Sequence, residues 1–383
     1  MRTFFASLSV LALVACSASE DVSAQAAEPA SGEATEVFTV EEMGSFDEPW
    51  AMTFLPNGIA LITEKGGTMR FIDFGPDTPR LGTVTGIPAV DYGGQGGLGD
   101  VVPHPDFAEN SLIYFSYAEA GEGDTRGAVV ARARLVMDEA DAGRLEDVET
   151  LWRQMPKTSR RGHYSHRIAF SPDGYLFIAS GDRQELEPAQ DLSNNLGTVI
   201  RLNDDGSVPD DNPFDGEDSP QTAEIWSYGH RNPLGLAFAP DGQLWDVEHG
   251  PAGGDELNRV ERGVNYGWPT VSNGEHYDGR PIPDHDTDDS FRAPAITWTP
   301  VIAPGGMIFY TGDMFADWQG DVLIAGLSTN ALVHVEIDGD SARELARYDF
   351  GNRMREVEQG PDGAIWVLED GEDGRLLRLT PGG

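Results

Sequence analysis

A phrase that recurs six times along the chain restricts the possible fold more than any other feature. Each copy is a turn rich in Pro, Asp, Asn and Gly, followed by a short run that alternates apolar with other residues. Proline fixes φ and glycine accepts a positive φ, so these residues favour a tight turn, and the alternation is typical of a half-buried strand. The copies are LPNGIALITEKGG, HPDFAENSLIYFSYA, SPDGYLFIASGD, APDGQLWDVEHG, ADWQGDVLIAGLS and GPDGAIWVLEDG.

The copies are spaced about 45 to 80 residues apart, which is typical of the blades of a β-propeller. Glycine-rich turns and the lack of a long segment with helical periodicity agree with this. A β-sandwich, or several small β domains with coincidental turns, is the alternative. The sequence therefore predicts an all-β protein with a single six-bladed β-propeller over residues 37–383, whose longer loops gather on one face.

The first 36 residues differ in character from the rest. Residues 1–15 have a basic start and an apolar run that is too short to span a bilayer, as in a secretory signal peptide. The run ends in Leu-Val-Ala-Cys, which resembles a bacterial lipobox, so we expect Cys16, the only cysteine, to carry lipid; a plain signal peptide is the alternative. Residues 16–36 are predicted to be a disordered acidic tether. We expect a lipid-anchored protein on the periplasmic side of a bacterial envelope, and Ser17 points to the outer membrane.

The formal charge of the chain is −39, from 65 acidic against 26 basic residues. Such a chain is not expected to bind nucleic acid, because each phosphate contact requires a cation. A solvated surface on a secreted protein accounts for the acidity. Lys65 and Lys157 are the only lysines, so nearly every cation is an arginine.

Polar loop segments, rather than any short nucleotide or hydrolase motif, carry the candidate chemistry. Glycines let the backbone approach a ligand, and Gln95 among them offers both an amide donor and an acceptor. Clustered arginines in an acidic protein indicate an anionic ligand that bears carboxylates. A lone histidine or surface arginine is more often structural, so these segments count only in combination. The segments are DYGGQGGLGDVVPHPDF (91–107), RRGHYSHRIAFSPDGYLFIASGDR (160–183), IWSYGHRNPLGLAF (225–238), EHGPAGGDELNRVERGVNYGWP (248–269) and GNRMREV (351–357).

The chain resembles the soluble pyrroloquinoline-quinone (PQQ) sugar dehydrogenases, especially the aldose sugar dehydrogenase branch. The resemblance runs from about residue 44 to the C-terminus and includes AQDLSNNLGTVIRLNDDGSVPDDNPF, YGHRNPLGLAF, EHGPAGGDELN, VIAPGGMIFYTGD and NRMREVEQGPDGAIWVLED. It implies a six-bladed propeller, PQQ and Ca²⁺ as cofactors, and oxidation of aldose sugars at the anomeric carbon to lactones.

The same resemblance implies roles for individual residues. His163 matches the catalytic base, with Asp182 orienting and stabilising its imidazole, and His166 is a neighbour without a role. Arg231 would polarise the reacting quinone oxygen. The residues implied to bind the cofactor are Gln95, Arg231, Asn232, His249, Arg353 and Arg355.

Calcium is implied at two places. The carbonyls of Gly250 and Pro251 match the ligands of the cofactor's ion, which would act as a Lewis acid. Asp255, Glu256 and Tyr266 match a second, structural calcium region, for which an ordinary acidic turn is the alternative.

Two positions depart from the better-known glucose dehydrogenases of this family. Ser328 stands where a lysine holds a cofactor carboxylate, and His249 stands in place of a glutamine. Losing that cation should weaken PQQ binding by ~1–2 kcal/mol unless an arginine replaces it.

Two other functions fit a propeller. A calcium-dependent lactonase or another hydrolase would require carboxylates that converge on one ion in the central tunnel. A non-catalytic surface propeller would bind a sugar or a protein. For the dehydrogenase, we expect an aldose substrate, an electron acceptor that the sequence does not identify, and a monomer or homodimer that touches the membrane only through lipid.

Overall fold

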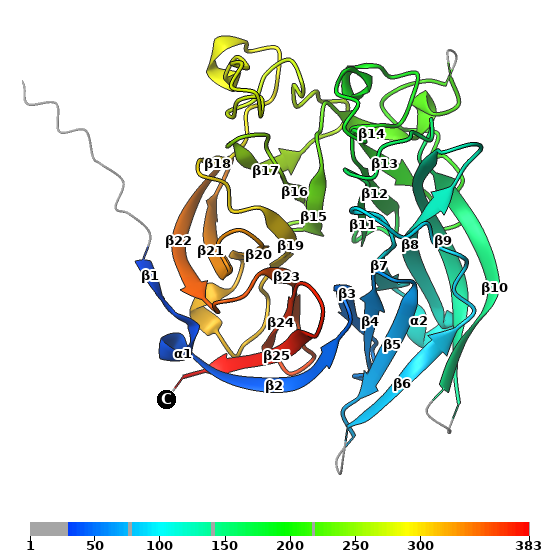
Figure 1. Ribbon diagram of the computed structural model, residues 1–383, viewed down its shortest axis with the longest axis vertical. Coiled ribbons are helices and arrows are strands. Elements are labelled where there is room, and N and C mark those ends of the chain that lie inside the picture. The colour runs from blue at the N-terminus through cyan, green and yellow to red at the C-terminus, as the bar shows by residue number, and fades with distance from the viewer. Residues whose placement is uncertain (1–29, 76–78, 139–141, 217–218, 383) are drawn as a thin grey trace, which may run out of the picture.

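Strands of an all-β protein surround a central axis in the computed structural model (Figure 1). The structure describes residues 30–75, 79–138, 142–216 and 219–382. The all-β prediction is confirmed. Short helical segments occur only in the connections between strands of the described residues: α1 (Ala34–Val37), α2 (Phe107–Asn110) and the 3₁₀ turns Glu187–Gln190, Thr222–Glu224, His285–Thr287 and Ala316–Trp318.

The described strands form five sheets, and two of these are antiparallel ladders of four strands that follow one another in the chain. The largest sheet has eight strands, because two antiparallel runs of four are joined by a parallel pairing of β6 with β10. Its order is β3 (Pro49–Phe54), β4 (Ala60–Glu64), β5 (Thr68–Asp73), β6 (Arg80–Thr85), β10 (Ala142–Arg153), β9 (Arg126–Met137), β8 (Leu112–Ala120) and β7 (Leu98–Pro103).

Two four-stranded sheets follow in sequence. They are β11 (Ser165–Phe170), β12 (Leu176–Ser180), β13 (Thr198–Leu202) and β14 (Ile225–Tyr228), then β15 (Pro233–Phe238), β16 (Leu244–Glu248), β17 (Asp255–Val260) and β18 (Ile296–Trp298). The five-stranded sheet runs in the order β19 (Pro304–Phe309), β20 (Val322–Gly326), β21 (Ala331–Asp338), β22 (Ser341–Asp349) and β1 (Ala30–Glu33). The last sheet runs in the order β23 (Met354–Gln359), β24 (Ile365–Glu369), β25 (Gly374–Pro381) and β2 (Phe38–Phe46).

The first strands of the six antiparallel runs form a ring. Strands β3, β7, β11, β15, β19 and β23 lie innermost in Figure 1, and each contacts the next, with β23 returning to β3. Strand β2, the second in the described chain, completes the last sheet by pairing antiparallel with the C-terminal strand β25, from Phe38 opposite Pro381 to Phe46 opposite Gly374. Residues 38–46 and 374–381, which lie near the two ends of the described chain, therefore share one sheet.

The six turn phrases each precede the second strand of a run, namely β4, β8, β12, β16, β20 and β24. The expectation of half-buried strands at these places is wrong. Every residue of β4, β12, β16, β20 and β24 is buried. The reason is that these central strands pack against neighbouring sheets on both faces; for example, Ile178 and Ile200 share a core with Tyr114 and Val130.

The N-terminal predictions fall partly outside the described residues. Residues 1–29, which include the expected signal peptide and Cys16, are not described. Residues 30–36, expected to belong to the disordered tether, form β1 and most of α1 instead, because β1 pairs with β22 and Ala34 packs into the core beside Phe38.

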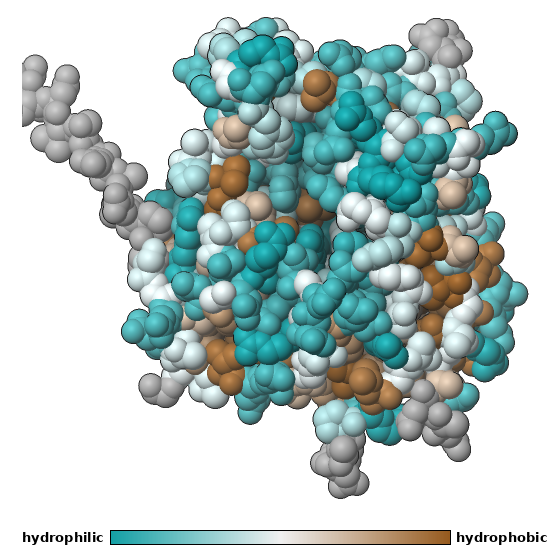
Figure 2. Space-filling view, viewed as in Figure 1, coloured by the Kyte–Doolittle hydropathy of each residue, from teal (hydrophilic) through white to brown (hydrophobic). Residues whose placement is uncertain are grey.

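Hydrophilic residues cover most of the face shown in Figure 2, as the charge of −39 requires. Among the described residues, no helix is long and apolar enough to cross a membrane.

Candidate active site

The fold gathers the predicted site residues at one end of the sheets. Gln95, His163, Asn232 and Arg353 come just before the innermost strands β7, β11, β15 and β23. Other candidates, such as Asp182, come just after a second strand. Since first and second strands are antiparallel, the start of one and the end of the other lie at the same edge.

His163 and Asp182 form the hydrogen-bonded pair that the resemblance implied. Strands β11 and β12 pair antiparallel with Ser165 opposite Ser180, and His163 Nδ1 lies 2.6 Å from Asp182 Oδ1. Two more donors hold the carboxylate: the Gln184 backbone N–H at 2.7 Å from Oδ1, and Trp268 Nε1 at 2.8 Å from Oδ2. A carboxylate can only accept, so Nδ1 carries the proton and Nε2 keeps a lone pair.

The protonation of this pair follows from its burial. Desolvation lowers the pKa of His163, although the hydrogen bond and charge of Asp182 oppose that shift. Burial acts to raise the pKa of Asp182, but the bond to and charge of His163, the charge of Arg231 and the bond from the Gln184 backbone together outweigh burial, so the pKa lies below its usual value. At neutral pH the imidazole is therefore neutral and the carboxylate is ionised, which is the state that a general base requires.

Backbone strain accompanies these two loops. His163, Ser165 and His166 have φ of 51°, 63° and 74°, and Arg183 and Gln184 have φ of 56° and 61°. Residues other than glycine are uncommon in the left-handed region and persist there only when their surroundings hold them, a pattern that is concentrated at functional sites.

Arg231 lies beside the pair. Its guanidinium donates from Nη1 to the carbonyl of His249 (3.0 Å) and from Nη2 to the hydroxyl of Tyr277 (3.3 Å), and it lies 5.2 Å from the Trp268 ring. Its buried Nε has no hydrogen-bond partner among the described residues. His163, Arg231, Pro251, Trp268 and Tyr277 line the same hollow of about 200 Å³.

A second hollow, of about 180 Å³, adjoins the first through Gln95, whose side-chain oxygen accepts the backbone N–H of His163 at 2.7 Å. It combines polar groups with aromatic and apolar walls. The residues that line it are Trp50, Lys65, Gly94, Gln95, Tyr164, Ser165, His166, Asn232, Leu234, His249, Leu327, Arg353 and Arg355. The structure thus brings the predicted cofactor-binding residues other than Arg231 to one cavity.

Three cations converge on this cavity although the protein is strongly acidic. Arg353 and Arg355 both donate to Asp370, at 2.8 and 2.7 Å, and Lys65 donates to Glu48 at 2.9 Å. Lys65 was missed by the sequence analysis. The one available signal was its rarity, since a lysine in a Gly-Gly turn after a strand is unusual in a chain with only two lysines.

Ser328 and His249 show how the two departures are accommodated. Ser328 is exposed and donates its hydroxyl to the carbonyl of Val301 at 2.9 Å. Arg353 comes within 3.4 Å of the neighbouring Leu327 carbonyl, so a guanidinium lies close to the position of the absent lysine. Burial lowers the pKa of His249 to about 3, so this imidazole is neutral and donates from Nε2 to Pro304 at 2.7 Å.

His166 is not equivalent to His163. It stacks on Tyr164 with 5.2 Å between ring centroids, and neither ring nitrogen has a hydrogen-bond partner among the described residues. Burial lowers its pKa to about 3. A neutral imidazole with no acidic partner has nothing to orient it or to stabilise its charged form.

The predicted calcium residues have other contacts. Asp255 accepts the backbone N–H groups of Gly250 (2.8 Å) and Ala303 (2.6 Å), one on each oxygen, so it braces the loop that carries Gly250 and Pro251. Burial raises the pKa of Asp255 to about 6.

Glu256 and Tyr266 meet at a buried histidine. The Tyr266 carbonyl lies 3.0 Å from His285 Nε2, and Glu256 Oε1 lies 3.8 Å from His285 Nδ1. The phenol of Tyr266 points elsewhere, donating to the Arg259 carbonyl at 2.5 Å. A structural calcium at Asp255, Glu256 and Tyr266 stays a prediction.

The carboxylates beside the axis converge on a guanidinium. Arg167 on β11 pairs with Glu356 on β23 and, at 3.5 Å, with Asp100 on β7, and it lies over the Trp50 ring at 4.4 Å. Burial raises the pKa of Asp100 in spite of Arg167. This is not the cluster of carboxylates around an open ion site that a calcium-dependent hydrolase would need.

Comparison with known proteins agrees with this geometry. A family model described as glucose/sorbosone dehydrogenase matches residues 46–378. The chain belongs to this family. The aldose sugar dehydrogenase YliI of Escherichia coli is 42% identical over 341 residues, which cover 88% of this chain and 90% of that protein. Quinoprotein glucose dehydrogenase B of Acinetobacter calcoaceticus is 26% identical over 448 residues, covering 95% of this chain and 91% of that protein.

Solved structures give the same relationship. The apo-form of the soluble aldose sugar dehydrogenase of E. coli superimposes with a TM-score of 0.84 at 41% identity, covering 90% of this chain and 99% of that one. The PQQ-bound aldose sugar dehydrogenase of Streptomyces coelicolor has a TM-score of 0.73 at 25% identity, covering 90% and 98%. Membership of a sugar dehydrogenase family, and with it an oxidoreductase activity, is therefore supported.

Proposed function

We propose that this protein is a PQQ-dependent aldose dehydrogenase that oxidises the anomeric carbon of sugars to lactones. The observation that carries the proposal is the buried His163–Asp182 pair beside a cavity that holds three cations. We also propose that each antiparallel run of four strands is one blade, which gives six blades.

The residues present fit PQQ. A ligand with several carboxylates would satisfy Lys65, Arg353 and Arg355, which at present share two acidic partners, Glu48 and Asp370. The unpartnered Nε of Arg231 offers a donor to a further oxygen. Gln95, Asn232 and His249 line the same cavity and supply amide and imidazole groups. The carbonyls of Gly250 and Pro251 would hold a Ca²⁺ beside the cofactor, since this ion prefers oxygen ligands.

When bound, PQQ would accept the hydride that leaves the anomeric carbon. His163 takes the proton of the anomeric hydroxyl at Nε2, because Nδ1 already donates to Asp182. The imidazolium that forms is stabilised by the ionised Asp182. One proton and one hydride leave the sugar, and the anomeric carbon becomes the carbonyl carbon of the lactone.

Arg231 has two roles in this scheme. It lines the same hollow as His163, where its positive charge favours negative charge that develops on a bound oxygen. Burial is the main cause of the lowered pKa of His163, and Asp182 opposes it. The positive charge of Arg231 lowers this pKa further and so helps to keep the base neutral.

We also retain the predictions that the structure leaves untested. A lipid on Cys16 would hold the enzyme at the periplasmic side of the envelope. The aldose, the electron acceptor and a monomeric or homodimeric state belong to the same proposal.

Reconstitution tests the proposed function. The purified protein is incubated with PQQ and Ca²⁺, and the reduction of an artificial electron acceptor is followed with a panel of aldoses. We expect PQQ to stay bound through gel filtration and at least one aldose to be oxidised. A protein that retains no PQQ and oxidises none of the sugars contradicts the proposal.

A further inference from the structure

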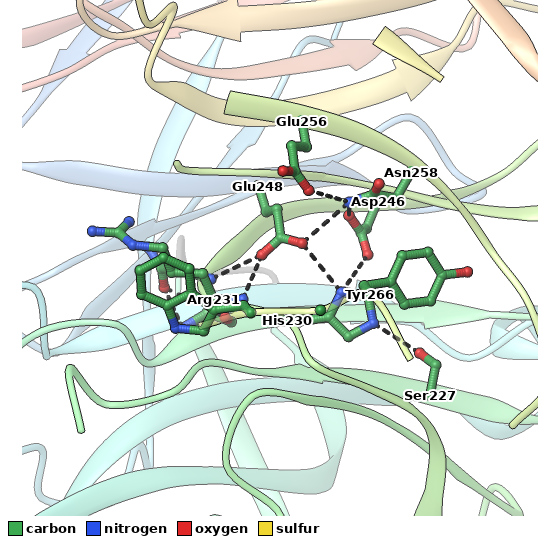
Figure 3. A network of polar contacts seen from close by, with 12 residues as sticks. Ser227, His230, Arg231, Asp246, Glu248, Glu256, Asn258 and Tyr266 are labelled. Atoms are coloured by element: carbon green, nitrogen blue, oxygen red, sulfur yellow. Dashed lines mark hydrogen bonds and ion pairs between the residues drawn. The ribbon is translucent and has the colours of Figure 1, made fainter. Parts of the chain in front are cut away.

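Figure 3 shows a buried cluster of acidic groups and one histidine. His230, Asp246 and Glu248 in this cluster are not among the residues that line the two cavities of the proposed reaction. His230 comes from the loop between β14 and β15, and Asp246 and Glu248 come from β16. The three residues are 0%, 0% and 3% exposed. One ligand atom from each lies within 4.8 Å of the other two.

The hydrogen bonds of His230 leave Nδ1 facing the carboxylates. Its Nε2 lies 2.9 Å from the hydroxyl of Ser227, while Nδ1 lies 3.2 Å from Asp246 Oδ2 and 3.3 Å from Glu248 Oε1. If Nε2 donates to Ser227, Nδ1 carries a lone pair. A histidine that binds a metal through one ring nitrogen commonly donates a hydrogen bond from the other, which fixes its tautomer.

The cluster has too much negative charge for its burial. A third carboxylate, Glu256, joins through Asn258, whose amide nitrogen lies 3.3 Å from Asp246, 3.1 Å from Glu248 and 3.5 Å from Glu256. Of the described residues, no lysine or arginine side chain bonds to any of the three carboxylates. Buried carboxylates must be paired, be protonated or bind a cation.

Two buried oxygens in the cluster are also without a hydrogen bond. Asp246 Oδ2, which faces His230, and Asn258 Oδ1 have no hydrogen-bond partner in the described part of the chain. Both residues are 0% exposed, so water does not satisfy these atoms from the surface. Buried polar atoms normally have a partner, so an orphaned oxygen that faces an imidazole nitrogen and a second carboxylate is suited to bind a ligand.

The distances favour a metal ion over a shared proton. Charge-assisted N–H···O bonds are about 2.7–2.9 Å long, shorter than the 3.2 and 3.3 Å seen here. Ligand atoms bonded to one transition-metal ion at roughly 2.0–2.2 Å lie about 3.0–3.4 Å apart for angles near 90–110°. The pair His334 and Asp321 provides a contrast within the same chain, since its nitrogen and oxygen are 2.7 Å apart.

We propose that His230 Nδ1, Asp246 Oδ2 and Glu248 Oε1 bind a divalent first-row transition-metal ion, of the Zn²⁺ class. One imidazole nitrogen with carboxylate oxygens suits such an ion better than Ca²⁺, which takes oxygen ligands alone. The burial of all three ligands makes the site structural, and the ion enters as the chain folds. The proposal is independent of PQQ.

The ion would stabilise the loop that carries Arg231 and Asn232, through Glu248. Glu248 Oε2 accepts the backbone N–H groups of Arg231 (2.6 Å) and Asn232 (3.2 Å), both of which face the cavities. A metal on Oε1 of the same carboxylate fixes the position of that acceptor. The loop that carries Arg231 then depends on the ion for its rigidity.

Metal analysis of the full chain tests the proposal. The protein is produced with Zn²⁺ in the medium, passed over a chelating resin and gel-filtered, and its zinc content per chain is measured by mass spectrometry. We expect one Zn²⁺ in the wild-type protein, none in Asp246→Asn, and one in the control Asp321→Asn, which alters a partly buried His–carboxylate pair of normal length. Refolding the wild-type protein with a chelator should lower its Tm.

A second measurement needs no variant. The wild-type protein refolded with Co²⁺ should show visible d–d absorption, and X-ray absorption at the metal edge should show one imidazole among oxygen ligands. The proposal is overturned by a wild-type protein that holds no transition metal, by equal zinc in the wild-type protein and Asp246→Asn, or by a Tm that is insensitive to the chelator.

Discussion

Replacing Asp182 with asparagine tests the reasoning about the catalytic pair most directly. Three N–H groups point at this carboxylate: His163 Nδ1 and the Gln184 backbone at Oδ1, and Trp268 Nε1 at Oδ2. An asparagine can accept on only one side. Its NH₂ group would face Trp268, because the Oδ1 side has two donors to satisfy, and two N–H groups would then oppose each other.

The size of the effect follows from the bond that changes. A hydrogen bond to a charged group contributes about 1.5–3 kcal/mol, and the imidazolium formed in the transition state loses that stabilisation. Each 1.36 kcal/mol is a tenfold change in rate, so we expect kcat/KM to fall roughly 10- to 150-fold. Asp182 raises the pKa of His163 against the effect of burial, so the pKa of the base falls further in Asp182→Asn. Activity that needs neutral His163 is lost as the pH falls through that pKa, so the acid limb of the pH–rate profile should move to lower pH.

The assay is dye-linked aldose oxidation by the PQQ-loaded protein between pH 4 and pH 9. Asp173→Asn, in the exposed turn between β11 and β12, is the matched control and should match the wild-type protein. The double variant Asp182→Asn/Trp268→Phe removes the opposed N–H groups and should recover Tm but not the rate. An acid limb that stays in place or moves to higher pH, or a full recovery of rate in the double variant, would refute the proposed role of Asp182.

Three further predictions separate roles within the cavity. His163→Ala should abolish aldose oxidation whereas His166→Phe should retain it, and equal losses would mean that the wrong histidine has been assigned. Lys65→Met should weaken PQQ binding by about tenfold or more, measured by fluorescence titration, because a charge-assisted bond to a carboxylate is lost, while Lys157→Met should bind as tightly as the wild-type protein. Burial lowers the pKa of His166 to about 3 in the folded protein, from 6.5 in the unfolded chain. Between these two values the unfolded chain binds a proton at this residue and the folded protein does not, so the free energy of unfolding decreases as the pH falls below about 6.5. Calorimetry should show that His166→Phe loses less stability than the wild-type protein between pH 7 and pH 4.5, by up to about 3 kcal/mol.

The turn phrases predicted where the second strand of each run begins, because proline and glycine act locally on φ. They did not predict that these strands are buried on both faces. The alternation within a strand of five residues indicates only which of its two faces is apolar. The other face is buried by a neighbouring sheet whose residues are distant in the sequence.

The candidate site was predictable to a similar extent. The pairing of His163 with Asp182 follows from the antiparallel arrangement of adjacent strands, which a sequence can indicate. Lys65 reaches its cavity from a segment remote from the other site residues, which no local pattern can predict. Trp268 lies within the segment 248–269, but no local pattern indicated that it contacts Asp182. Asp246 lies in the strand after the fourth turn phrase, and its burial beside His230 became visible only in the structure.

The pairing of β2 with β25 sets an order on folding. The last sheet lacks its outer strand until residues 38–46 meet residues 374–381. Contacts so distant in the sequence form slowly, because the intervening chain must first be drawn together. Until then β25 presents an unpaired edge, which other chains can join. Fusions or truncations that hinder residues 38–46 should therefore affect the yield of soluble protein more than the chemistry of the finished molecule.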